Sequence, residues 1–143
     1  MNNIQEVFEY VAAHLIKQGK PSLASYDSKR KEYRYSGGCS YRGANGTSCA
    51  VGCLIPDDEY KVVLEWVSVI ELLSEKHVPT LTSLNENIEG LESMLLDLQV
   101  FHDNDHNWDT EGFSQRGIFM LNQIASDHGC KTGHLLKKNF LTP

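Results

Sequence analysis

The chain from Cys39 to Cys53 reads Cys39-Ser-Tyr-Arg-Gly-Ala-Asn-Gly-Thr-Ser-Cys-Ala-Val-Gly-Cys53, and this stretch decides whether the fold is all-helical or mixed. The Asn45-Gly46 pair near its centre is the strongest short-range signal for a β-hairpin turn. We therefore expect a β-hairpin or small antiparallel sheet near residues 33–55. Because helical spacing prevails elsewhere, the sequence predicts an α+β fold in which four helices pack on this hairpin.

The three cysteines of this stretch are candidate metal ligands. Cys49 and Cys53 share a face in a strand or a helix, because a spacing of four is both even and close to one helical turn. A two-residue loop pairs Arg42 with Cys49 and turns Cys39 to the opposite face, whereas a three-residue loop gathers all three thiols. Their C-x9-C-x3-C spacing lacks the C-x2-C knuckle of structural zinc sites. The alternative is that they are small core residues.

Helix signals lie on both sides of this stretch. Asn3 and Glu6 form a capping box, and apolar residues follow at helical spacing, which predicts a helix over residues 4–18. Between Tyr60 and Val67 the chain is rich in valine and tryptophan, and periodicity does not choose between strand and helix there.

Two further capping boxes begin at Ser68 and Ser83. They predict helix starts just before Val69 and just before Leu84. The second of these helices is expected to be the longest, because its apolar stripe continues through Ile88, Leu91, Leu95 and Leu98.

The last helix is expected to start at Asp109 and to end at Gly129. Trp108 before the cap and Phe113 inside the helix have the spacing of a hydrophobic staple. Residues 130–143 then form a short tail that we expect to be loosely docked.

Length and composition point to one ordinary globular domain. The chain has 143 residues, of which 41% are hydrophobic and 22% charged.

Its apolar runs are too short for a transmembrane span, and its first residues lack a secretory signal, so the cytoplasm is the expected compartment. A net charge of −6 argues against a dedicated nucleic-acid or anionic-membrane binder. The one basic run, residues 29–31 with Arg34, is expected to be a solvated loop or an edge strand.

Residues 101–108 gather two histidines, two aspartates and two asparagines. His102 and His106 are four apart and share a face if the helix continues that far, a spacing that suits a transition-metal ion. Asp103 or Asp105 could then supply an oxygen ligand or position an attacking water. The alternative is that His102, which continues the apolar stripe, is a buried histidine with a hydrogen-bond partner.

Asp57 and Asp58 follow a proline directly after the cysteine-rich stretch. Proline and carboxylates in a first turn are typical of a helix start. The same segment, together with Tyr60, could present a negatively charged edge to a basic partner.

A longer motif runs through this region and reads Cys39-x-Tyr41-Arg42-Gly43-x-x-Gly46-x-x-Cys49-Ala50-Val51-Gly52-Cys53-Leu54-Ile55-Pro56-Asp57, with Leu98-Gln99 and His102-Asp103 further on. The chain thereby resembles a family of small uncharacterised proteins found mainly in bacteriophages and bacterial mobile elements. Where such relatives tend to carry Pro-Asp at the turn, this chain has Ala44-Asn45. The resemblance implies an accessory role directed at host enzymes or defences, and it brings no established catalytic residues.

The leading hypothesis is therefore a phage-type accessory protein that binds a host protein, for host takeover or counter-defence. It requires no cofactor and no membrane, and the sequence leaves the oligomeric state open. The candidate binding residues are Tyr41, Arg42, Asp57, Asp58 and Tyr60.

The first alternative is a metal-dependent hydrolase, such as a nuclease. His102 and His106 would hold a divalent metal ion, and Asp103 and Asp105 would be the catalytic residues. This is the hypothesis that involves nucleic acid.

The second alternative is a nucleotide-sequestering protein. Arg42 and Arg34 would hold phosphates, and Tyr41 or Trp66 would stack on the base. The chain lacks a glycine-rich phosphate loop that leads into a helix, which places this hypothesis last.

Overall fold

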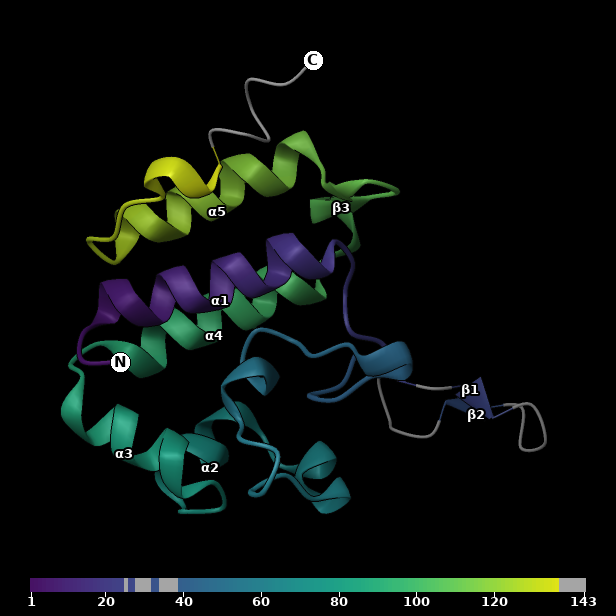
Figure 1. Cartoon of the computed structure of the whole chain (residues 1–143), viewed down its shortest axis with the longest axis vertical. Helices are drawn as coiled ribbons and strands as arrows, with labels where there is room; N and C mark the ends of the chain where they lie inside the picture. The colour runs from purple at the N-terminus through teal and green to yellow at the C-terminus, as the bar shows by residue number, and fades with distance from the viewer. Residues whose placement is uncertain (25, 28–31, 34–38, 137–143) are drawn as a thin grey trace.

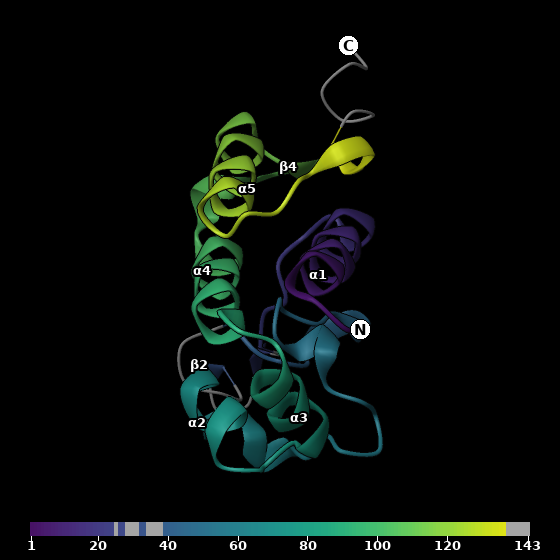
Figure 2. The same ribbon diagram turned by 90° about the vertical axis from the view of Figure 1, so that its left-hand side faces the viewer.

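Three helices form the body of the molecule. α1 (Ile4–Gln18), α4 (Leu91–Asp103) and α5 (Gln115–Asp127) have roughly parallel axes in the computed structural model, and the chain runs along α5 in the direction opposite to α1 and α4 (Figure 1). The structure describes residues 1–24, 26–27, 32–33 and 39–136. α2 (Val69–Ser74) and α3 (Pro79–Asn87) pack against α4 at one end of this body (Figure 2). The predominance of helix is as predicted.

α1 forms where the sequence predicts it. The backbone N–H of Glu6 donates to Asn3 Oδ1 at 2.9 Å, and the N–H of Asn2 donates to Glu6 Oε2 at 2.9 Å. The first of these bonds satisfies an N–H group that a helix start otherwise leaves without a partner. The Ser68 cap of α2 is confirmed in the same way, because Ser68 Oγ accepts from the N–H of Glu71 at 3.2 Å.

The helix predicted to start before Leu84 is wrong in its start and its length. Ser83 lies inside α3, which begins at Pro79, where a preset φ and a missing N–H suit the first helical position. Gly90 has a φ of 80° and separates α3 from α4. Because glycine adopts this left-handed conformation at little cost, the apolar stripe from Leu84 to Leu98 is divided between two helices. The described residues contain five α-helices, where four helices were expected.

The predicted helix cap at Asp109 is also wrong. Ser114 caps α5, since its Oγ accepts from the N–H of Gly117 at 3.0 Å. Asp109 lies instead in a hairpin of two short strands, β3 (Trp108–Asp109) and β4 (Gly112–Phe113). The rings of Trp108 and Phe113 do meet, with centroids 4.9 Å apart, but they meet across this hairpin and not along a helix.

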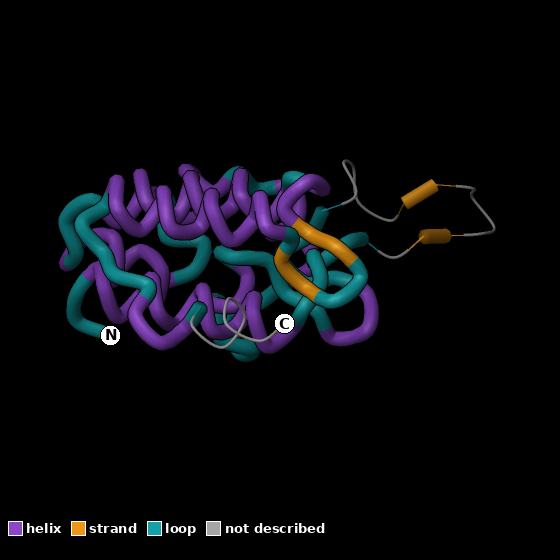
Figure 3. Tube along the Cα trace, turned by 90° about the horizontal axis from the view of Figure 1, so that it is seen from above, coloured by secondary structure: helices purple, strands orange, loops and turns teal. Residues whose placement is uncertain are grey.

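The predicted α+β class is confirmed, and the first two strands come before the turn at Asn45. β1 (Tyr26–Asp27) pairs antiparallel with β2 (Glu32–Tyr33), and this pair lies away from the helices (Figure 3). The basic residues 29–31 and Arg34 fall outside the described residues.

The hairpin predicted around Asn45-Gly46 is reduced to a tight turn. Arg42 pairs with Ser48 in an isolated antiparallel bridge, and the residues between them form η1 (Ala44–Gly46), in which Asn45 and Gly46 both have a positive φ. Neither predicted register occurs, because Arg42 pairs with Ser48 and not with Cys49, and the pairing does not extend back to Cys39. Cys39 pairs with Leu23 instead of facing the cysteines that follow it.

Gly52 determines how the chain continues after this turn. It begins η2 (Gly52–Leu54), which passes directly beneath Tyr41. A Cβ atom at position 52 would collide with the carbonyl oxygen of Tyr41, so a residue without a side chain is required here. The undecided run after Tyr60 forms the 3₁₀ helix η3 (Val62–Trp66).

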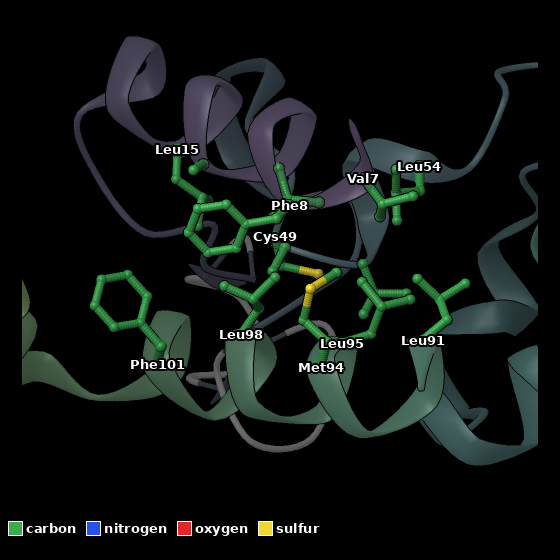
Figure 4. Close-up of a cluster of buried hydrophobic side chains, with 14 of the residues drawn as sticks. Val7, Phe8, Leu15, Cys49, Leu54, Leu91, Met94, Leu95, Leu98 and Phe101 are labelled. Atoms are coloured by element: carbon green, nitrogen blue, oxygen red, sulfur yellow. The ribbon is translucent and has the colours of Figure 1, made fainter. Parts of the chain in front are cut away.

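The core lies between α1 and α4 (Figure 4). The thiol of Cys49 is fully buried among their side chains, which supports the interpretation of this cysteine as a core residue. The labelled core members in this view are Val7, Phe8, Leu15, Leu54, Leu91, Met94, Leu95, Leu98 and Phe101.

The segment after α5 is docked on α1 as far as the described residues extend. The side-chain amide of Gln5 donates to the Lys131 carbonyl at 2.9 Å and accepts from the Lys131 N–H at 2.8 Å. The segment continues through η5 (Gly133–Leu135) to Leu136, which is buried. No helix among the described residues is long and apolar enough to cross a membrane.

Candidate functional site

Glu65 of η3 organises the region around the cysteine-rich turn. Its carboxylate accepts from the backbone N–H groups of Tyr41 and Arg42 at 2.9 and 3.1 Å. It also accepts from the Tyr60 hydroxyl at 2.5 Å. Glu65 was not among the site residues predicted from the sequence, although a single carboxylate within the apolar run from Val62 to Val67 is a usable signal for a half-buried polar contact.

Arg42 brings together three of the predicted binding residues. Its guanidinium donates to Asp57 Oδ1 at 2.7 Å and to the Ile55 carbonyl at 2.6 Å, and it lies 5.0 Å from the centre of the Tyr60 ring. Asp58 is exposed beside this group. The segment from Pro56 to Tyr60 is a hydrogen-bonded turn and not the predicted helix start.

The position of Tyr41 suits a structural role better than stacking on a ligand. Its side chain is buried, and its hydroxyl donates to the Val67 carbonyl at 2.6 Å. Burial and then nearby negative groups raise the pKa of this hydroxyl. The nucleotide hypothesis thus has little open ring surface to use at Tyr41, and Arg34 lies outside the described residues.

His102 is buried at the end of α4 and joins three segments of the chain. Its Nε2 accepts from the backbone N–H of Ser22 at 2.8 Å, and its Nδ1 lies 2.7 Å from Asp103 Oδ1. Because Nε2 accepts, the proton of the neutral ring resides on Nδ1 and is donated to Asp103. Asp103 also accepts from Gln99 Nε2 at 3.0 Å and from the thiol of Cys39.

The potential ligand atoms of Cys39, His102 and Asp103 lie within 4.8 Å of one another. A metal ion at His102 Nδ1 would require the ring proton to move to Nε2, which faces the N–H of Ser22. Metal-bound histidines normally donate from their second nitrogen, so this arrangement fits a metal ion poorly.

His106 does not join His102 as the spacing predicted. α4 ends at Asp103, and the chain continues into η4 (Asp105–Asn107), so the two histidines do not share a helical face. His106 and Asp105 are exposed and line a shallow hollow with Asp103. Of the five residues proposed for metal binding, the structure brings Cys39 and His102 together. His106 belongs to no group of potential metal ligands found among the described residues.

A cavity of about 260 Å³ lies between the cysteine-rich turn, the start of α2 and the end of α4. We call it the Asp103 cavity. Its polar lining consists of Cys39, Ser40, Glu65, Ser68, Gln99 and Asp103.

The thiols of Cys39 and Cys53 are protonated at neutral pH. Burial raises the pKa of Cys39 to about 12, and the charge and hydrogen bond of Asp103 add to this effect. Burial raises the pKa of Cys53 to about 12 as well, although Arg42 opposes the shift. A thiolate nucleophile is therefore absent at both positions near pH 7.

We expect native Cys39 to react with iodoacetamide at pH 8 roughly a thousandfold more slowly than an ordinary cysteine, since the thiolate is the reactive form. Asp103→Asn should accelerate Cys39 and leave Cys53 unchanged, because Asp103 raises the pKa of Cys39 alone of the two. Peptide mapping by mass spectrometry measures both rates, and fully buried Cys49 reports any unfolding. A native Cys39 that reacts as fast as free cysteine would contradict this assignment.

An exposed apolar surface lies on the next elements of the chain. Val62, Val63 and Trp66 of η3 and Ile70 of α2 are 53%, 62%, 60% and 51% exposed, and we call these four residues the η3–α2 patch. Val63 and Trp66 are three apart and share a face of the 3₁₀ helix. Two further exposed apolar residues, Val100 and Phe119, lie on α4 and α5.

Comparisons with protein-family models, curated proteins and solved structures give no match to this chain.

Proposed function

We propose that this chain is a protein-binding module that docks on its partner through the η3–α2 patch. The observation that supports the proposal is that four large apolar side chains within residues 62–70 are each more than half exposed. Single exposed apolar residues are ordinary, but a local group that includes tryptophan is typical of an interaction site.

The charge around the patch defines the partner. Residues 57–76 carry six carboxylates (Asp57, Asp58, Glu59, Glu65, Glu71, Glu75) and two lysines (Lys61, Lys76), a net charge of −4 out of the −6 of the chain. Complementary potentials favour a partner surface with an apolar centre and a basic rim. In the setting implied by the sequence resemblance, this partner is a host protein in the cytoplasm whose activity is redirected or inhibited.

The test combines crosslinking with a matched surface control. A photo-crosslinking residue at position 63 should capture a protein other than this chain in cells that contain the chain, whereas the same residue at position 119 on α5 should not. With the captured protein purified, Trp66→Ser should weaken binding by at least about tenfold, as expected for a central aromatic residue. Phe119→Ser, which removes an equally exposed ring, should leave the Kd within about twofold.

Two results would contradict the proposal. One is a captured partner whose affinity is unchanged by Trp66→Ser in protein that circular dichroism shows to be folded. The other is crosslinking at position 63 only to a second copy of the chain.

A metal-dependent hydrolase is the second candidate. The grouping of Cys39, His102 and Asp103 is the observation in its favour, and the Ser22 N–H that donates to His102 Nε2 is the observation against it. Its catalytic residues would be Asp103 and Asp105. Calorimetric titration of the purified protein with Zn²⁺ or Mn²⁺ tests it. Stoichiometric binding that Cys39→Ser abolishes and His106→Ala preserves would support the candidate, and a flat titration would eliminate it.

A further inference from the structure

We propose that a second copy of this chain binds along α5, with the two α5 helices antiparallel and related by a two-fold axis. The observation that carries this inference is a stripe on α5 that has opposite charges at its two ends, Arg116 and Asp127, and the exposed ring of Phe119 between them. This stripe belongs to other elements than the η3–α2 patch, so the inference goes beyond the proposed function and does not depend on it.

The residues of this stripe share one face of the helix. Arg116 and Asp127 are eleven residues apart, close to three turns of 3.6 residues, so they project on the same side of α5. Phe119, Met120 and Gln123 lie between them at spacings of three, four and seven from Arg116, which keeps them on this side. Both charged residues are exposed, and the ring of Phe119 is 66% exposed.

The stability of α5 does not explain the positions of these two charges. The N-terminal end of a helix favours negative side chains, and its C-terminal end favours positive ones. α5 has the reverse, because Arg116 lies in its first turn and Asp127 is its last residue. Arg116 makes no ion pair or hydrogen bond with a described residue, and the described donor to Asp127 is the neutral side-chain amide of Gln123, at 2.9 Å. Partners of opposite charge in another molecule account for both residues.

A two-fold axis supplies both of these partners at once. When two antiparallel copies of α5 meet with the axis level with the bond between Leu121 and Asn122, Arg116 of each copy lies opposite Asp127 of the other. This register forms two ion pairs at the ends of the contact and places the two Phe119 rings near its centre. An unrelated protein would have to match both charges at this spacing, whereas a second copy matches them by symmetry.

The surface next to the stripe is also suited to an interface. α4 lies beside α5 (Figure 2), and a groove of about 220 Å³ lies between the two helices. Apolar side chains from both helices line this groove, and one of them, Val100, is 68% exposed. An apolar centre with charged residues at the rim is typical of protein interfaces.

The test is an exchange of charges followed by analytical ultracentrifugation. We expect the wild-type chain to dimerise with a micromolar Kd, as suits a small interface. Arg116→Glu and Asp127→Arg should each weaken dimerisation by at least about tenfold, because each sets like charges opposite one another. An equimolar mixture of the two variants should dimerise as the wild type does, since both contacts between the two different chains then join opposite charges. Each substitution agrees with the helix dipole, so the Tm of neither variant should fall.

A pair of aromatic substitutions locates the contact. Phe119→Ser should weaken dimerisation by at least about tenfold, as expected for a central aromatic residue. Trp66→Ser removes a similarly exposed ring from the η3–α2 patch and should leave dimerisation within about twofold of the wild type. A photo-crosslinking residue at position 119 should join two copies of this chain.

A wild-type chain that stays monomeric at its highest soluble concentration would overturn the inference, as would a mixture of the charge variants no more dimeric than each variant alone. Dimerisation that Trp66→Ser abolishes and Phe119→Ser preserves would overturn it as well, because the second copy would then occupy the η3–α2 patch. Phe119→Ser tests the contact between copies and Trp66→Ser tests partner binding, so failure here is distinguishable from failure of the proposed function.

Discussion

His102→Ala is expected to lower the free energy of unfolding by about 3 to 5 kcal/mol, the largest effect of any single substitution in the candidate site. The ring is fully buried, and it is the acceptor for the N–H of Ser22. Its removal leaves that N–H without its acceptor and opens a cavity between α4 and the segment that follows α1. Urea unfolding followed by circular dichroism measures the change.

His106→Ala is the matched control. It also removes an imidazole, but from an exposed position in η4, so the change in unfolding free energy should stay within about 0.5 kcal/mol. Equal effects of the two substitutions would show that His102 does not have the structural role described here.

Glu65→Ala is expected to cost about 3 kcal/mol of unfolding free energy, because three donors lose a charged acceptor at once. Two of these donors are backbone N–H groups of Tyr41 and Arg42, which have no rotamer that reaches another acceptor. Thermal and urea unfolding should agree on the loss, and the amides of Tyr41 and Arg42 should exchange with solvent faster than in the wild type.

Glu75→Ala provides the comparison for this prediction. Glu75 is exposed, and its contact with His77 is 3.4 Å long at the surface, so its loss should cost less than about 0.5 kcal/mol. Glu65→Gln retains one oxygen acceptor and should fall between the two. A Glu65→Ala protein as stable as Glu75→Ala would refute the organising role of Glu65.

Local signals predicted much of the helical structure correctly. The N-caps predicted at Asn3 and Ser68 form, because an N-cap depends on hydrogen bonds within four residues of the chain. The burial of His102 also follows from its place on the apolar stripe. The α+β class is correct even though the turn that suggested it pairs only one residue on each side.

Two of the wrong predictions, the helix starts at Ser83 and at Asp109, occurred where two local signals compete. Ser83 and Asp109 both have the chemistry of a cap, but Pro79 and Ser114 offer starts that suit the packing of α3 and α5 better. Gly90 interrupts the apolar stripe, although the spacing of the apolar residues continues unchanged across this position. Of two possible helix starts, the one that forms is the one that lets the helix after it bury its apolar face, because this burial supplies most of the stability of a helix in a protein.

The sequence alone determined the features that depend on neighbouring residues: the extent of α1, the start of α2, the predominance of helix and the concentration of negative charge in residues 57–76. Only the tertiary structure decided which distant side chains meet. Cys39 lies beside Asp103, the Glu65 carboxylate accepts from the N–H of Tyr41, and His102 accepts from the N–H of Ser22. These contacts join residues separated by 24 to 80 positions, and no periodic pattern spans such distances. The physical reason is that long-range contacts are selected by the packing of the whole core, which leaves no trace in the spacing of any one segment.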